Sequence, residues 1–141
     1  MTTNRARQAF GERVRTYVRQ LHGEGAENAF HALRESGPEA LGDLASSFKS
    51  ESVPAVRADL VRIAWQTRSA SAVPLLKEAL RDEAPSVWKE ALDGLVTLGG
   101  AEALEVIREA RDDVDHLKSQ WFAEAEQQIV SREDASRDER R

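Results

Sequence analysis

Apolar residues recur three or four positions apart along most of the chain. Leu60 and Ile63 follow Val56 at this spacing, and Ala91 follows Val87 in the same way. This period places the apolar side chains on one face of a helix, whereas a strand would need strict alternation. The pattern therefore predicts an all-α protein with amphipathic helices.

Glycine and proline divide this pattern into segments of roughly 11 to 16 residues, the length of ordinary globular helices. The dividing positions are Gly23 and Gly25, Gly37 and Pro38, Pro54, Pro74, Pro85, and Gly99 and Gly100. Pro54 and Pro85 fit the first turn of a helix, where a missing N–H costs no hydrogen bond. The breaks predict a series of helices joined by short turns.

The helical segments repeat with an offset of 31 residues. The matched pairs are Val56 and Val87, Val61 and Leu92, Ala64 and Leu95, Leu75 and Val106, Leu76 and Ile107, and Ala79 and Ala110. Pro54 and Pro85 are 31 apart as well, so turn chemistry and core pattern share one period. A helical hairpin repeated in this way predicts a solenoid.

Two segments carry a resemblance to a known family: SVPAVRADLVRIAWQTRSASAVPLLKEALRDE and APSVWKEALDGLVTLGGAEALEVIREARDD. With an early Pro, a Val-Arg type pair and a Leu-rich second helix, they resemble HEAT repeats, especially the short bacterial variety. Trp88 departs from the pattern because it replaces the Arg of that pair. The resemblance implies a short right-handed α-solenoid of HEAT-like helical hairpins with N- and C-terminal capping helices.

One domain is expected over residues 1–130, followed by a disordered charged tail over 131–141. Its predicted parts are a capping helix at 3–22, hairpins at 24–50, 53–82 and 84–112, and a last helix at 115–130. Asp115 is predicted to be the N-cap of the last helix. The side chains of this helix that we expect to be buried against the third hairpin are Leu117, Trp121, Phe122, Ala125 and Ile129.

The formal net charge of −5 is unevenly distributed. Residues 1–22 carry five Arg against Glu12, whereas residues 23–130 carry eleven basic against twenty acidic side chains. An acidic body repels phosphate backbones and attracts basic surfaces, so nucleic-acid binding is disfavoured and a partner with a basic patch is favoured. The basic first helix is the exception to this charge pattern.

Sequence signatures of catalysis and of targeting are absent. The chain has no Cys, its three His show no metal-ligand spacing, and it lacks phosphate-binding loops and a serine elbow. Asp112, Asp113 and Asp115 fit helix capping better than a calcium loop. We therefore expect no enzyme activity, metal or cofactor. We also expect no membrane span and a cytoplasmic location, because the Arg-rich start differs from a signal peptide.

The resemblance places the second helix of each hairpin on the concave side of the solenoid. Taking the Leu-rich positions as core leaves an outward strip, with Trp88 at its edge as an anchor for a partner. The strip consists of Lys77, Glu78 and Arg81, of Arg108, Glu109 and Asp112 at the offset of 31, and of Ser46, Ser47 and Ser50 in the first hairpin. We expect a monomer or weak dimer that binds a protein partner there, as an adaptor or inhibitor, with toxin immunity as a narrower version.

Two alternatives remain open from the sequence. HEAT-like proteins include chromophore lyases and DNA glycosylases, so an enzyme or enzyme accessory is one alternative, although glycosylases need a basic groove. The other is contact with an anionic membrane or nucleic acid through the basic first helix. Salt-dependent DNA binding and vesicle co-sedimentation would distinguish them.

Overall fold

The computed structural model describes residues 2–139. The helices in this part are α1 (Thr2–Gln20), α2 (Ala26–Glu35), α3 (Leu41–Ser50), α4 (Pro54–Gln66), α5 (Val73–Ala79), α6 (Pro85–Leu98), α7 (Gly100–Arg111) and α8 (His116–Glu139). Short 3-10 turns over Gly37–Ala40 and Ala70–Ala72 lead into α3 and α5. The prediction of an all-α protein is confirmed.

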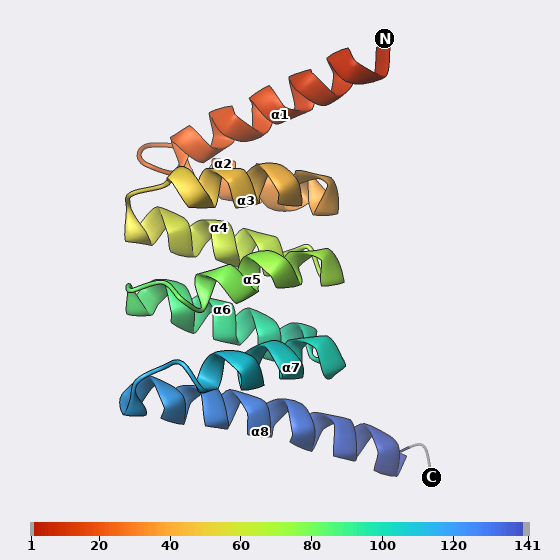
Figure 1. Ribbon diagram of the computed structural model, residues 1–141. Helices are drawn as coiled ribbons and strands as arrows, with labels where there is room; N and C mark the ends of the chain where they lie inside the picture. Colours follow the sequence, from red (N-terminus) through yellow and green to blue (C-terminus); the bar gives the residue numbers. More distant parts are fainter. Residues whose placement is uncertain (1, 140–141) are drawn as a thin grey trace.

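The helices stack as successive hairpins (Figure 1). Helices α2, α4 and α6 form one layer, here called the first-helix layer, and α3, α5 and α7 form the second-helix layer. Helices α1 and α8 cover the two ends of the stack (Figure 1). This arrangement is an α-solenoid, as the repeated pattern predicted.

The core follows the 31-residue repeat. Val56 and Val87 are both buried, and Leu76 and Ile107 are fully buried at equivalent places in α5 and α7. Pro54 and Pro85 each begin the first helix of their hairpin. Because equivalent side chains fill equivalent spaces, one contiguous core extends from α1 to α8.

The junction between α4 and α6 is the closest contact of the first-helix layer. Trp65 of α4 lies against Gly94 of α6, where a Cβ atom would come within 2.6 Å of the indole ring. The indole Nε1 donates a hydrogen bond to Glu90 Oε1 at 3.0 Å. Arg62 donates two hydrogen bonds to the same carboxylate, at 3.0 and 3.3 Å. Gly94 thus allows the two helices to approach each other.

A partly buried acid stabilises the turn between the second and third hairpins. Asp82 accepts hydrogen bonds from Arg57 Nε at 2.8 Å and Arg57 Nη2 at 3.1 Å. Asp82 Oδ1 also accepts from the backbone amide of Ala84 at 2.9 Å. The guanidinium donates in addition to the carbonyls of Glu51 and Ser52, so one Arg joins two successive turns.

In the third hairpin Trp88 occupies the position of Arg57, so this cation is missing. Lys118 of α8 supplies a replacement cation. Its Nζ donates to the carbonyl of Leu80 at 3.1 Å and lies 3.5 Å from the carbonyl of Asp82, which is the equivalent of the Glu51 carbonyl. The departure from the family pattern at one residue is therefore compensated by a residue 30 positions later.

Replacement of Arg57 by Gln is expected to reduce the stability at neutral pH by about 1 to 2 kcal/mol, because charged hydrogen bonds to Asp82 are lost. Burial raises the pKa of Asp82, but hydrogen bonds from Arg57 and the Ala84 amide outweigh it and hold the net pKa below its ordinary value. A lowered carboxylate pKa adds stability above the unfolded pKa, and this stability is lost as the pH falls. Urea unfolding of the wild type and the variant at about pH 7 and at about pH 2.5 measures the loss of unfolding free energy at each pH. The loss should be smaller at the lower pH, and an equal loss at the two pH values would contradict this ion pair.

Helix α8 continues to Glu139, beyond residue 130, so the prediction of disorder is wrong for residues 131–139. Extending an existing helix adds a hydrogen bond for each residue ordered, and this segment contains Arg, Glu and Ala, which favour helix. Arg132 Nη1 also donates to the carbonyl of Val96 at 2.8 Å, which fixes this part of α8 to the end of α6. The last two residues of the predicted tail lie outside the described part.

No helix within residues 2–139 is both long and apolar enough to cross a bilayer.

Candidate functional site

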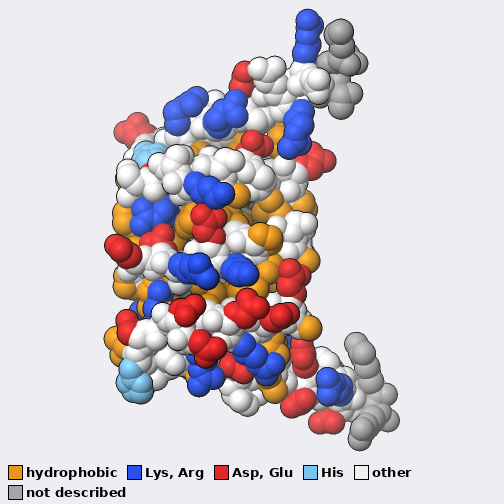
Figure 2. Space-filling model, in the orientation of Figure 1, with side chains coloured by type: hydrophobic (Ala, Val, Ile, Leu, Met, Phe, Trp, Pro, Cys, Tyr) orange, Lys and Arg blue, Asp and Glu red, His pale blue; other side chains and the backbone are white. Residues whose placement is uncertain are grey.

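The second-helix layer presents the predicted strip to solvent. Helix α5 exposes Lys77 and Glu78, and Arg81 is exposed just after it. Glu109 is exposed near the end of α7, and Asp112 directly follows that helix. Lys77 Nζ and Glu109 Oε2 are 3.6 Å apart, and this ion pair links α5 to α7. Figure 2 shows basic and acidic side chains over this face of the molecule.

Helix α3 contributes little to the strip. Ser46 and Ser50 are exposed, but their hydroxyls donate to carbonyls within their own helix, and Ser47 is half-buried. The charged positions of the predicted strip therefore lie on α5 and α7 and directly after them.

Arg108 has a different role from the one predicted. Its Nε donates to Glu126 Oε1 of α8 at 2.7 Å, and Arg111 donates to the other oxygen of that carboxylate at 3.1 Å. The hydrogen bond from Arg108 lowers the pKa of Glu126, and burial opposes this change. Because both arginines are paired with α8, the exposed surface of α7 is left acidic.

A groove of about 390 Å³ lies between α5 and α7. Glu102, Glu105 and Glu109 are exposed along one side of α7, at spacings of three and four residues. The groove, here called the acidic groove, is lined by Val73, Pro74, Lys77, Glu102, Glu105, Val106 and Glu109. It combines an apolar floor with three carboxylates and one ammonium group.

Glu102 and Glu105 were missed by the sequence analysis. By the offset of 31, Glu102 is equivalent to Ser71, which precedes the shorter helix α5, and Glu105 is equivalent to Pro74 in its first turn. The strip was extended from positions near the end of α5, so the first turns of α7 were left out. Their spacing with Glu109 on one helix face was the signal that could have found them.

Trp88 is buried, with 8% of its surface exposed, so the prediction of an exposed anchor at this residue is wrong. Two rings of α8 pack against it: Trp121 lies edge-on with its ring centre 5.9 Å away, and the ring centre of Phe122 is 6.2 Å away. Lys118 Nζ lies 5.2 Å from the ring centre. Trp88 thus joins α6 to α8 and takes no direct part in a surface site.

Two side chains of α8 that were expected in the core are exposed. Leu117 is 72% exposed and Trp121 is 45% exposed. They are equivalent to Ser86 and Glu90 of α6, which lie at the surface and in the partly exposed α4–α6 junction. The repeat register therefore directs them away from the core, whereas Phe122, Ala125 and Ile129 are buried as predicted.

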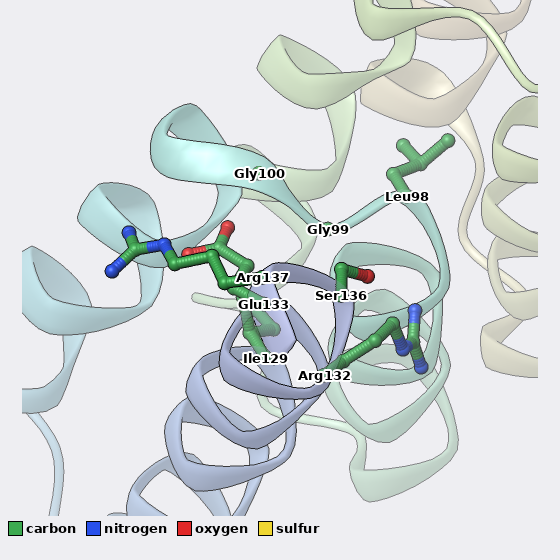
Figure 3. Close-up of a pocket in the computed structure, with 8 residues that line it drawn as sticks. All are labelled: Leu98, Gly99, Gly100, Ile129, Arg132, Glu133, Ser136 and Arg137. Carbon is green, nitrogen blue, oxygen red and sulfur yellow. The ribbon is translucent and has the colours of Figure 1, made fainter. Parts of the chain in front are cut away.

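A second hollow, of about 460 Å³, lies where the extended end of α8 meets the turn between α6 and α7 (Figure 3). Figure 3 shows Ser136 of α8 next to the loop at Gly99, with the Arg132 and Arg137 side chains extending to opposite sides. Arg132 is already engaged by carbonyls of α6. Arg132 therefore serves to fix α8 to the end of α6.

The three histidines lie apart from one another. His22 is hydrogen-bonded to Glu51 at 2.7 Å, and His31 lies 3.1 Å from Arg34. Asp115 accepts the amide of Lys118 at 2.9 Å, which confirms its role as an N-cap. Over residues 2–139 no three His, Asp or Glu side chains come together in a way that could hold a metal ion.

Helical hairpins that stack on their neighbours define the class of helical-repeat proteins. Within that class the chain belongs to the HEAT-repeat family, because the family model for HEAT repeats matches residues 41–125. HEAT repeats generally mediate protein–protein interaction. The sequence matches none of the curated proteins with which it was compared.

Proposed function

We propose that this protein is a non-enzymatic interaction module, an adaptor or inhibitor, that binds a basic segment of another protein in the acidic groove. The observation that carries the proposal is the combination of Glu102, Glu105 and Glu109 with an apolar floor in one groove. Apolar contact supplies affinity, while the carboxylates select a basic partner and speed its approach. Inhibition of a basic toxin is one form of such binding.

The pairing of Arg108 and Arg111 supports this assignment. Both guanidinium groups are held by Glu126, so they do not neutralise the carboxylates on the exposed side of α7. Lys77 lies 3.6 Å from Glu109, but both side chains are more than half exposed, and such a surface pair is weak. A partner's Lys or Arg can therefore replace Lys77 at small cost.

Removing the three carboxylates is expected to weaken partner binding about tenfold or more, at about 0.5 to 1 kcal/mol for each charge pair. The variant is Glu102→Gln, Glu105→Gln, Glu109→Gln. A partner captured from the source cells by the immobilised wild-type protein is purified, and its affinity for each variant is measured by calorimetry at two salt concentrations. Binding should weaken with salt, because exposed charges are screened.

The matched control changes the net charge equally, at exposed carboxylates near the other end of the stack: Glu24→Gln, Glu35→Gln, Glu39→Gln. It is expected to bind as the wild type does. Equal affinities for all three proteins, or equal losses in both variants, would show that the acidic groove is not the site.

A further inference from the structure

Helix α1 has one face in the core and one face in solvent. Val14, Val18 and Leu21 are buried, and they pack α1 against α2 and α3. Among residues 2–139, no helix packs on the other side of α1, and its N-terminal part extends past the layers below it (Figure 1). Residues 4–9 are accordingly exposed all round the helix.

The solvent side of α1 is rich in arginine. All five of its basic side chains are exposed: Arg5, Arg7, Arg13, Arg15 and Arg19. The ion pairs among residues 4–139 involve none of them. Arg19 donates to the Thr16 hydroxyl, Arg13 lies over Phe10, and Arg15 approaches Gly11, as does Asp43 of α3. The guanidinium groups therefore remain available to an anionic partner.

The acidic groove does not cancel this charge, although Glu12 of α1 and the exposed Glu27 and Glu35 of the neighbouring α2 lie nearer to the arginines. The acidic groove is on α5 and α7, and α3 separates α5 from α1 in the stack (Figure 1). At about 8 to 10 Å for each packed helix, α7 lies roughly 25 Å from α1. This exceeds the screening length of about 8 Å at physiological salt, so the carboxylates of the acidic groove have little effect on a ligand at α1.

We propose that α1 is a second binding surface that contacts the phosphate backbone of duplex DNA. Every basic residue of α1 is Arg, and the guanidinium fork matches phosphate oxygens in pairs. From Arg5 to Arg19 the charges span about 21 Å of helix, which suits a row of regularly spaced phosphates. A helix of about 10 to 12 Å diameter also fits a major groove about 12 Å wide.

An anionic membrane fits α1 less well than DNA does. Binding of a helix to a bilayer surface needs an apolar face that enters the headgroup region. Most of the apolar face of α1 is covered by α2 and α3, because Val14 and Val18 are at most 7% exposed and Phe10 and Tyr17 are partly buried against the core. Arginine charge without apolar insertion leaves a soluble polyanion as the partner.

The test measures binding to a fluorescent DNA duplex of about 20 base pairs by anisotropy at about 50 and 200 mM salt. With three to four phosphate contacts, the affinity of the wild type should fall roughly 40- to 150-fold between these concentrations. The variant Arg5→Gln, Arg13→Gln, Arg19→Gln should bind at least about tenfold more weakly at the lower salt concentration. All three side chains are exposed, and circular dichroism checks that the variant remains helical.

A matched control, Arg68→Gln, Arg81→Gln, Arg137→Gln, makes the same change in net charge at exposed positions outside helices α1 to α3 and should bind DNA as the wild type does. Absence of DNA binding by the wild type at the lower salt concentration would overturn the proposal, and so would equal losses in the two variants. A glutamate-rich peptide, or vesicles with anionic lipid, bound more tightly than DNA would assign α1 to an acidic protein or to a membrane instead.

Discussion

Phe122→Ala is expected to destabilise the protein by about 3 to 5 kcal/mol, the usual cost of removing a buried Phe side chain. Phe122 is fully buried and contacts Trp88, so truncation leaves a cavity between α6 and α8. The surroundings cannot collapse freely, because Lys118 and Arg108 fix α8 to the preceding hairpin. Urea unfolding measures the loss, and the melting temperature should fall by about 10 to 20 °C.

Leu117→Ala is the matched control on the same helix. Leu117 is 72% exposed, so its truncation should change the free energy of unfolding by less than about 0.5 kcal/mol. The sequence alone assigned both residues to the core, whereas the structure separates them. Similar losses in the two variants would mean that α8 packs in a different rotation about its axis.

Gly94→Val is expected to destabilise the protein by about 3 kcal/mol through overpacking. A Cβ atom at residue 94 would lie 2.6 to 2.9 Å from three atoms of Trp65. The indole cannot easily move, because its Nε1 is hydrogen-bonded to the carboxylate of Glu90, which Arg62 also holds. Thermal unfolding of the variant measures the cost of separating α4 from α6.

Gly42 provides the control for Gly94. It lies in helix α3 and is exposed, and a Cβ atom added at this residue would meet no neighbouring atom within 4 Å. Gly42→Val should therefore be neutral or slightly stabilising, by a few tenths of a kcal/mol, since Val favours helix more than Gly does. A stability loss at Gly42 as large as that at Gly94 would show that introducing a β-branched side chain, and not the Trp65 contact, sets the cost.

The repeat and most of the core could be predicted from the sequence. Pro54 and Pro85 mark the same position of successive hairpins, and Val56 and Val87 are both buried there. A 31-residue period in apolar residues is sufficient, because each hairpin contacts mainly its neighbours and local pattern determines which face is buried. Asp115 could also be identified, since N-capping depends on residues within one turn.

The candidate site was predicted in part. Lys77 and Glu109 were placed on one surface, and they lie 3.6 Å apart. Arg108 was assigned to the same surface, but its partner Glu126 lies 18 residues later on α8, and nothing in the spacing indicates that pairing. Glu102 lies in the first turn of α7, which has no counterpart in the shorter helix α5, whereas Glu105 is equivalent to Pro74 within α5.

The fold class, the repeat length and the helix faces that form the core thus follow from the order of residues alone, because they depend on local periodicity. Tertiary packing sets which partner each long side chain reaches. It buried Trp88 under α8, exposed Trp121, and continued α8 to Glu139 beside α6. Such choices depend on how the end helices rotate and pack, since flexible charged and aromatic side chains contact residues that are distant in sequence.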